Sequence, residues 1–220
     1  MPSYPDTESA RRRLFHHLRR ELDDERVLCA MEQVPRHLFV PEAHRSLAYD
    51  DIPLPIGEGQ TISQPFIVAL MTSALELKED DSVLELGTGS GYQAAILATL
   101  VLRGRVLSLE RLPSLARGAG DLLRALGYEN VEVRLAGPRL GAPEEAPFDA
   151  ILVTAAAPRL PRTLLDQLVP GGRMVIPVGP LQEQELMKVV KTVEGHRVTE
   201  LGPCRFVPLI GEEAWGEGQF

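Results

Sequence analysis

A glycine-rich segment near the middle of the chain indicates its fold class more clearly than any other part of the sequence. Residues Val83 to Tyr92 read Val-Leu-Glu-Leu-Gly-Thr-Gly-Ser-Gly-Tyr, and a helix-compatible run follows from Gln93 to Leu102. This order predicts a strand, a tight turn and a helix. Glycine lets the backbone turn sharply and lets a ligand approach the main chain, as in the nucleotide-binding turns of α/β proteins. The segment therefore predicts a site for a nucleoside-bearing ligand.

The spacing of the glycines indicates which ligand. Gly87, Gly89 and Gly91 form G-x-G-x-G, whereas a pyrophosphate-binding turn reads G-x-G-x-x-G. Glu85 would repel a pyrophosphate and suits an ammonium group. A second acid, Glu110, ends the next apolar run, where an acid commonly binds ribose hydroxyls. The two acids favour S-adenosylmethionine, which carries an ammonium and a sulfonium, over NAD; an ordinary turn with solvated carboxylates is the remaining alternative.

Composition limits the class of protein and its partners. The 220 residues, 44% of them hydrophobic, suit one globular domain with an extension. The net charge of −8 argues against nucleic-acid binding, and the basic segment Arg11 to Arg20 is interpreted as the solvated face of an amphipathic helix. Cys29 and Cys204 lack metal-binding spacing, so no metal is expected. No apolar run reaches the roughly 18 residues that span a bilayer. We expect a cytoplasmic monomer without membrane contact.

Strands and helices alternate from Ser82 onward, which predicts a doubly wound α/β fold with a mainly parallel sheet. The last two strands flank a short polar turn and are expected to form an antiparallel hairpin at the sheet edge. Pro170 to Gly172 is expected to be a turn, and Gly141 to Ala146 a surface loop. Strands are expected at 82–86, 105–109, 131–135, 149–154, 173–178, 186–193 and 197–207, and helices at 65–75, 92–102, 113–126 and 161–168.

We expect one domain built from three parts. These are a helical N-terminal extension with a substrate loop at 1–80, a ligand-binding core at 81–180, and edge strands with a tail at 181–220. Thr7 to Val34 has the apolar spacing of helices with one buried face. Val40 to Gln64 is rich in proline and glycine, so it can form neither a long helix nor a central strand. Because this segment also carries apolar residues, it is expected to be an ordered, functional loop over the core.

Several segments resemble a known enzyme family. Glu85 to Tyr92, with Pro147 to Ile151 and Leu168 to Gly172, resembles the class I S-adenosylmethionine-dependent methyltransferases. Gly59 to Pro65 and Phe206 to Leu209 are more specific and resemble protein-L-isoaspartate O-methyltransferases in order and spacing. The same resemblance extends to Val34 to Arg36, Leu54 to Gly57, Val153 to Ala156 and Pro177 to Gly179.

The resemblance implies an enzyme that methylates the α-carboxylate of L-isoaspartyl residues in damaged proteins and peptides. S-adenosylmethionine would be the methyl donor and S-adenosylhomocysteine the product. The implied cofactor contacts are Thr61, Ile62, Glu85, Gly87, Thr88, Gly89, Gly91, Tyr92, Glu110 and Gly137. The implied substrate contacts are Thr61, Ser63, Asp50, Phe206, Val207 and Pro208.

The residue expected to act directly on the substrate is Ser63. A carboxylate is already ionised at neutral pH, because its reference pKa is about 4, so methyl transfer to it requires hydrogen-bond donors and no general base. Thr61 and Ser63 also suit capping of the helix that opens at Pro65. Asp50 or Asp51 fits substrate binding and loop attachment equally well. Phe206 to Leu209 also fits packing, and Gln184 fits a surface role as well as a site role.

The sequence departs from the family pattern after the strand at 131–135. Ala136-Gly137-Pro138 stands where the family usually has Gly-Asp-Gly, whose acid is expected to reach the adenine amino group. Losing that hydrogen bond predicts cofactor binding weaker by on the order of 1 kcal/mol. Two alternatives remain: a catalytically idle protein that recognises isoaspartyl sites, and a small-molecule methyltransferase. Glu85, Glu110 and the Gly59 to Pro65 segment argue against both.

Overall fold

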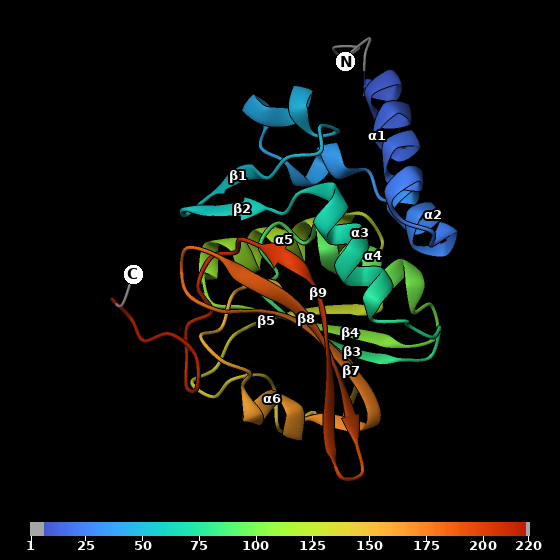
Figure 1. Cartoon of the computed structure of the whole chain (residues 1–220). Helices are drawn as coiled ribbons and strands as arrows, with labels where there is room; N and C mark the ends of the chain where they lie inside the picture. Colours follow the sequence, from blue (N-terminus) through green and yellow to red (C-terminus); the bar gives the residue numbers. More distant parts are fainter. Residues whose placement is uncertain (1–6, 219–220) are drawn as a thin grey trace.

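The computed structural model describes residues 7–218. Within this range seven strands form one sheet in the order β5-β4-β3-β6-β7-β8-β9, and β1 and β2 form a separate hairpin. Strands β3 to β7 run parallel, while β8 and β9 lie antiparallel at one edge (Figure 1). The predicted α/β fold with a mainly parallel sheet and an antiparallel edge hairpin is confirmed.

None of the helices in residues 7–218 combines the length and the apolar character needed to cross a membrane.

The order of helices and strands agrees closely with the expected alternation. The helices are α1 (Thr7–Glu21), α2 (Glu25–Gln33), the 3-10 helices η1 (Arg36–Phe39) and η2 (Glu42–Leu47), α3 (Pro65–Ala74), α4 (Tyr92–Leu100), α5 (Pro113–Ala125) and α6 (Arg162–Asp166). The strands are β1 (Leu54–Gly57), β2 (Gln60–Ile62), β3 (Ser82–Leu86), β4 (Arg105–Glu110), β5 (Val131–Leu135), β6 (Phe148–Val153), β7 (Leu168–Val178), β8 (Gln184–Thr192) and β9 (Gly195–Cys204).

The sheet has an apolar layer on each face. Side chains alternate along a strand, so Val83 joins the cluster under the N-terminal helices, α3 and α4, whereas Leu84 joins the cluster with α6. Figure 1 shows α3, α4 and α5 on one side of the sheet and α6 on the other. Because both faces are covered, the central parallel strands are apolar almost throughout, as such strands usually are.

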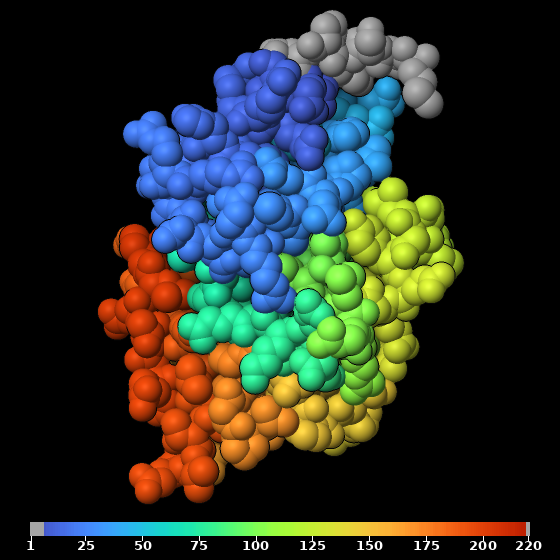
Figure 2. Space-filling view, turned by 90° about the vertical axis from the view of Figure 1, so that its right-hand side faces the viewer, coloured from blue at the N-terminus to red at the C-terminus, as the bar shows by residue number. Residues whose placement is uncertain are grey.

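The N-terminal helices α1 and α2 form an outer layer over the helices α3 and α4, which lie on the sheet. Leu14, Phe15 and Leu18 of α1 are buried, and α2 packs on α3 and α4. Arg26 of α2 donates hydrogen bonds to the carbonyl oxygens of Leu77 and Leu100, which joins this layer to the core. In Figure 2 the blue N-terminal part lies directly on the green part that contains α3 and α4.

Two local expectations were wrong, and a third holds except at one residue. Leu54 to Ile62 is a β-hairpin instead of an irregular loop, because Pro55 pairs with Thr61 in a strand with no second neighbour. Pro170 to Gly172 lies inside β7, where a register shift between Phe148 and Ala150 of β6 accommodates the extra residues as a bulge. The loop at Gly141 to Ala146 is not wholly at the surface, because Ala142 is buried.

Gly118 provides a test of the helical layer, because it is exposed in the middle of α5 with no atom within 4 Å of the position of a Cβ. We expect Gly118→Ala to raise the free energy of unfolding by about 0.5–1 kcal/mol, measured by urea denaturation. Gly104→Ala is the matched contrast, since its Cβ would lie 2.0 Å from the carbonyl oxygen of Asp81 and should destabilise the protein. Destabilisation by Gly118→Ala would contradict this description of α5.

Candidate active site

A cavity of about 350 Å³ opens where the central parallel strands end. Segments far apart in the chain form its walls: the β2–α3 segment, the glycine turn after β3, the end of β4, the loop after β5, and the segment after β9. Ligands of open α/β sheets bind in crevices outside the carboxyl ends of the strands. The cavity thus lies where the glycine-rich motif predicts a ligand.

The glycine turn is held tightly against the neighbouring strands. The backbone N–H groups of Gly87 and Thr88 both donate to the carbonyl oxygen of Leu109, at 2.8 and 3.3 Å. Gly87 has φ +100°, and a Cβ there would lie 2.3 Å from the Thr154 hydroxyl oxygen. That hydroxyl donates to the carbonyl oxygens of Leu86 and Gly87 at 2.9 and 2.7 Å. Only glycine fits this position, so the main chain itself forms the wall of the cavity.

Glu110 lines the cavity at the end of β4, as the sequence predicts for a ribose ligand. Its Oε2 accepts a hydrogen bond from the backbone N–H of Gly89 at 2.9 Å, and its Oε1 accepts one from Leu112 at 3.0 Å. These bonds fix the carboxylate and tie it to the glycine turn. Each carboxylate oxygen retains a further lone pair, so Glu110 can still accept hydrogen bonds from a hydroxyl pair.

Glu85 lies behind the cavity wall and not on its surface. It is fully buried, and its Oε2 accepts a hydrogen bond from the Ser108 hydroxyl at 2.5 Å. The Ser108 and Thr88 oxygens are 2.6 Å apart, and since Ser108 donates to Glu85, Thr88 donates to Ser108. Thr88 lines the cavity and is thereby left with a lone pair for a donor such as an ammonium group. Glu85 thus reaches the cavity through Ser108 and Thr88.

The second oxygen of Glu85, Oε1, is buried and has no hydrogen-bond partner within residues 7–218. Burial raises the pKa of Glu85 to about 8, and the nearby Glu110 adds to the rise, although the Ser108 hydrogen bond opposes it. A buried oxygen without a partner and a raised pKa are what a carboxylate shows before a cationic ligand compensates its charge. This is the observation on which the fit of an ammonium-bearing cofactor rests.

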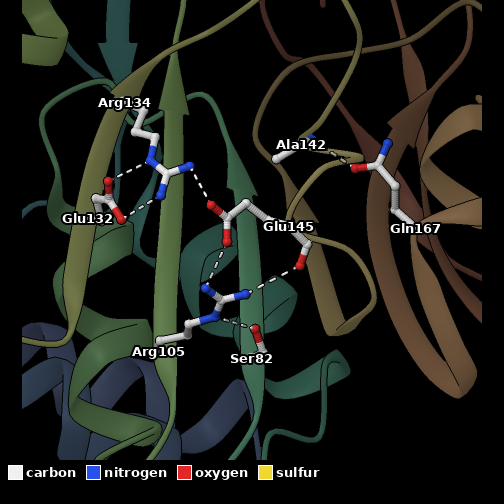
Figure 3. A network of polar contacts seen from close by, with 7 residues as sticks. All are labelled: Ser82, Arg105, Glu132, Arg134, Ala142, Glu145 and Gln167. Atoms are coloured by element: carbon white, nitrogen blue, oxygen red, sulfur yellow. Dashed lines mark hydrogen bonds and ion pairs between the residues drawn. The ribbon is translucent and has the colours of Figure 1, made fainter.

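The loop after β5 carries the altered adenine segment, and Gly137 and Pro138 line the cavity. Gln167 fixes the next part of this loop, because its Oε1 accepts from the Ala142 backbone N–H at 2.8 Å and its Nε2 donates to the Leu140 carbonyl at 2.9 Å. At the far end of the loop, Glu145 pairs with two arginines, Arg134 at 2.8 Å and Arg105 at 3.0 Å. Figure 3 shows both anchors.

The segment from Gly59 to Pro65, which the family resemblance marks as the substrate segment, places Thr61, Ile62 and Ser63 in the same cavity as the glycine turn. Neither Thr61 nor Ser63 caps α3, since Asp51 accepts the backbone N–H of Phe66 at 2.8 Å and the Gln64 side chain at 2.9 Å. The capping alternative for Thr61 and Ser63 is therefore wrong, and Asp51 has the loop-holding role. Within residues 7–218 the Ser63 hydroxyl makes no hydrogen bond, which leaves it available to a ligand.

The remaining implied contacts divide between the cavity and its support. Tyr92, Val207 and Pro208 line the cavity. Asp50 is exposed and outside the lining, and Gly91 is also outside it. A Cβ on Gly91 would lie 3.2–3.3 Å from Leu123 and Ala119, so this glycine allows α5 to pack closely. The direct ligand contacts implied for these two residues, and for Glu85, stay predictions.

The C-terminal segment is attached by a glutamine that the sequence left ambiguous. Gln184 is buried, and its Oε1 accepts the Phe206 backbone N–H at 2.8 Å while its Nε2 donates to the Pro180 carbonyl at 2.6 Å. A surface role for Gln184 is therefore wrong. Phe206 lies outside the lining, and Leu209 bonds to Ala156 at its backbone. Gln184 thus brings Val207 and Pro208 to the cavity.

The parallel sheet, its glycine turn and the acids at the ends of β3 and β4 define the class I S-adenosylmethionine-dependent methyltransferases. Among these, the family model described as protein-L-isoaspartate(D-aspartate) O-methyltransferase matches residues 9–214. The chain belongs to this family, and S-adenosylmethionine is its cofactor. The residues of the site fit that cofactor: Thr88, backed by the buried Glu85 through Ser108, offers an acceptor for an ammonium, and Glu110 offers acceptors for a ribose beside the main chain of the glycine turn.

Individual relatives agree with this assignment. The chain is 57% identical over 196 residues, 89% of its length and 91% of the relative's, to "Protein-L-isoaspartate O-methyltransferase 1" of Syntrophobacter fumaroxidans. A solved protein-L-isoaspartate O-methyltransferase is 30% identical to this chain, with a TM-score of 0.83. The match covers 92% of this chain and 66% of the solved chain. A Plasmodium falciparum structure described as a putative member in complex with S-adenosyl-L-homocysteine is 28% identical, with a TM-score of 0.78 and coverage of 90% and 96%.

The buried Glu85 predicts a pH dependence of stability for the protein without cofactor. The ordinary carboxyl pKa of 4.5 applies to the unfolded chain and a pKa of about 8 to the folded one. Between these values the folded state retains a proton that the unfolded state has lost, so the free energy of unfolding falls as pH rises from 4.5 to about 8. In the Glu85→Gln variant the free energy of unfolding should fall less over this pH range, by on the order of a few kcal/mol. Urea denaturation of both proteins at several pH values measures the difference.

The exposed Glu129→Gln is the control for this experiment and should leave the pH dependence unchanged. A Glu85→Gln variant whose stability follows the same pH curve as the unsubstituted protein would contradict a protonated Glu85.

Gly137 provides a test of the adenine loop. We expect Gly137→Asp to strengthen S-adenosylhomocysteine binding about fivefold, as one additional hydrogen bond worth about 1 kcal/mol allows. Isothermal titration calorimetry measures the dissociation constant, with Ala125→Asp, at an exposed residue outside the cavity lining, as the control for an added acid. Unchanged or weaker binding by Gly137→Asp would mean that the loop, as Gln167 fixes it, does not lie over adenine.

Proposed function

We propose that this protein transfers the methyl group of S-adenosylmethionine to the α-carboxylate of L-isoaspartyl residues in damaged proteins and peptides. The observation that carries the proposal is that Thr61 to Ser63 lines the same cavity as the glycine turn. This arrangement brings a substrate segment typical of the family next to the cofactor turn. The names of the relatives support the same activity.

The reaction requires positioning more than acid or base catalysis. When bound, S-adenosylmethionine supplies an electrophilic methyl group on a positively charged sulfur. An isoaspartyl carboxylate is ionised at neutral pH, since its reference pKa is about 4, so no residue has to remove a proton. Ser63 donates a hydrogen bond that holds the carboxylate, and orientation of this kind supplies several kcal/mol in enzyme reactions. The methyl ester formed collapses to a succinimide, and its hydrolysis returns some aspartate.

The hairpin β1–β2 gives the site its cover. Gly59 to Ile62 lines the cavity, and Ile56 approaches Gly89, where a Cβ would lie 3.3 Å from its methyl group. Val207 and Pro208 add a further apolar part of the wall. Such walls exclude water from an electrophile and strengthen the electrostatic interactions inside the site. We further propose that the enzyme is a cytoplasmic monomer that does not bind nucleic acid, in keeping with its net charge of −8.

The proposal is tested with two peptides that differ only in isoaspartate or aspartate at one position. Labelled S-adenosylmethionine should place base-labile methyl groups on the isoaspartyl peptide alone. Methylation of neither peptide, with S-adenosylhomocysteine binding demonstrated by calorimetry, would contradict the proposal and favour an isoaspartyl-recognition protein or a small-molecule methyltransferase.

Ser63→Ala tests the residue assigned to the carboxylate. A hydrogen bond to a charged group contributes about 1.5–3 kcal/mol, so kcat/KM for the isoaspartyl peptide should fall roughly 10- to 100-fold. S-adenosylhomocysteine affinity should stay within about twofold, since the lost hydroxyl serves the substrate. Ser46→Ala, at an exposed serine, is the control. Equal activity of the Ser63→Ala and Ser46→Ala variants would remove Ser63 from the mechanism.

A further inference from the structure

Arg36 in η1 is a fully buried arginine behind the wall that carries Ser63. Its Nε donates to the Ala48 carbonyl oxygen at 2.9 Å, and its Nη2 donates to the Ser63 carbonyl oxygen at 2.8 Å. Its guanidinium carbon lies 4.8 Å from the centre of the Tyr92 ring. Ser63 and Tyr92 line the cavity and Arg36 does not. The arginine therefore joins the substrate segment to the first residue after the glycine turn.

The charge of Arg36 has no carboxylate partner within 4.0 Å among residues 7–218. Its Nη1 is buried without a hydrogen bond in that part of the chain. Tyr92 stabilises the charged form of Arg36 most, ahead of Asp51, whose oxygens already accept hydrogen bonds from Phe66 and Gln64. Burial lowers the pKa of Arg36, yet arginine stays protonated in proteins. An unpaired buried charge is strongly unfavourable, so its presence next to the cavity requires an explanation.

The Tyr92 ring offsets only part of that penalty, because a cation over an aromatic face gains modestly even when water is excluded. An anion on the cavity side of Ser63 would offset more, since charges attract across low-dielectric protein over distances at which water would screen them. The carboxylate of the substrate is such an anion. Its charge is present before methyl transfer and absent from the ester afterwards.

We propose that Arg36 is a positioning residue that selects an ionised carboxylate at Ser63 by its charge and holds the Ser63 segment against Tyr92. The proposal rests on the proposed function, because it takes the isoaspartyl carboxylate as the anion. Arg36 acts through Ser63 and across the wall, without touching the substrate. Because the charge of the carboxylate disappears during transfer, Arg36 favours the bound substrate more than the transition state, so its effect falls on KM more than on kcat.

The test compares binding of an isoaspartyl peptide with binding of its α-carboxamide analogue, which has the same shape without the charge. Calorimetry is done on protein saturated with S-adenosylhomocysteine. The unsubstituted protein should prefer the carboxylate, and the neutral variants Arg36→Met and Arg36→Gln should lose at least about tenfold of that preference. Arg36→Lys, which keeps the charge, should retain most of it. Arg26→Met removes an arginine that also bonds two carbonyls, away from the cavity, and should leave the preference unchanged.

Steady-state kinetics provide the second measurement. For the neutral variants KM for the isoaspartyl peptide should rise about tenfold, with kcat within about threefold. Arg36→Gln retains a side-chain donor for Ser63 and carries the test if Arg36→Met does not fold. Unchanged preference in a folded neutral variant, a lost preference in Arg36→Lys, or a fall in kcat at constant KM would overturn the role of Arg36. Absence of methylation by the unsubstituted protein would instead refute the proposed function itself.

Discussion

The parallel pairing of β3 with β4 determines the geometry of the whole site. It aligns Glu85 with Ser108 and Leu86 with Leu109, so the acid of one strand meets the hydroxyl of the next. The carbonyl of Leu109 then receives two backbone N–H groups of the glycine turn, and Glu110 receives a third. Both acids therefore serve the turn before any ligand arrives. The cofactor pocket is preorganised by a strand register that apolar packing on both faces of the sheet enforces.

The substrate side of the cavity is built differently, from irregular segments attached by buried or half-buried polar side chains. Asp51 holds the start of α3, Arg36 holds Ser63, and Gln184 holds the segment that carries Val207 and Pro208. Each bonds backbone groups that are partly buried and that no helix or strand ladder satisfies. The ends of regular strands form the cofactor side of the cavity, whereas side-chain anchors set the position of the peptide-binding walls.

The fold and the position of the ligand cavity could be predicted from the sequence because they depend on local patterns. Strand alternation, the glycine spacing and Glu110 all lie in short windows. The role of Asp51, the anchoring by Gln184 and the chain from Glu85 through Ser108 depend on contacts between distant segments, so no local pattern reveals them. The bulge in β7 was missed for a related reason: Pro-Gly-Gly is typical of turns, and the pairing with β6 overrides that tendency.

We propose that one cavity brings a carboxylate at Ser63 next to the cofactor turn at Gly87 to Gly89. The decisive experiment is a crystal structure of the protein with S-adenosylhomocysteine and an isoaspartyl peptide. The isoaspartyl α-carboxylate should lie within hydrogen-bond distance of the Ser63 hydroxyl, about 2.5–3.0 Å, with an oxygen facing the cofactor sulfur. A carboxylate bound away from Thr61 to Ser63, or a peptide held outside the cavity, would contradict it.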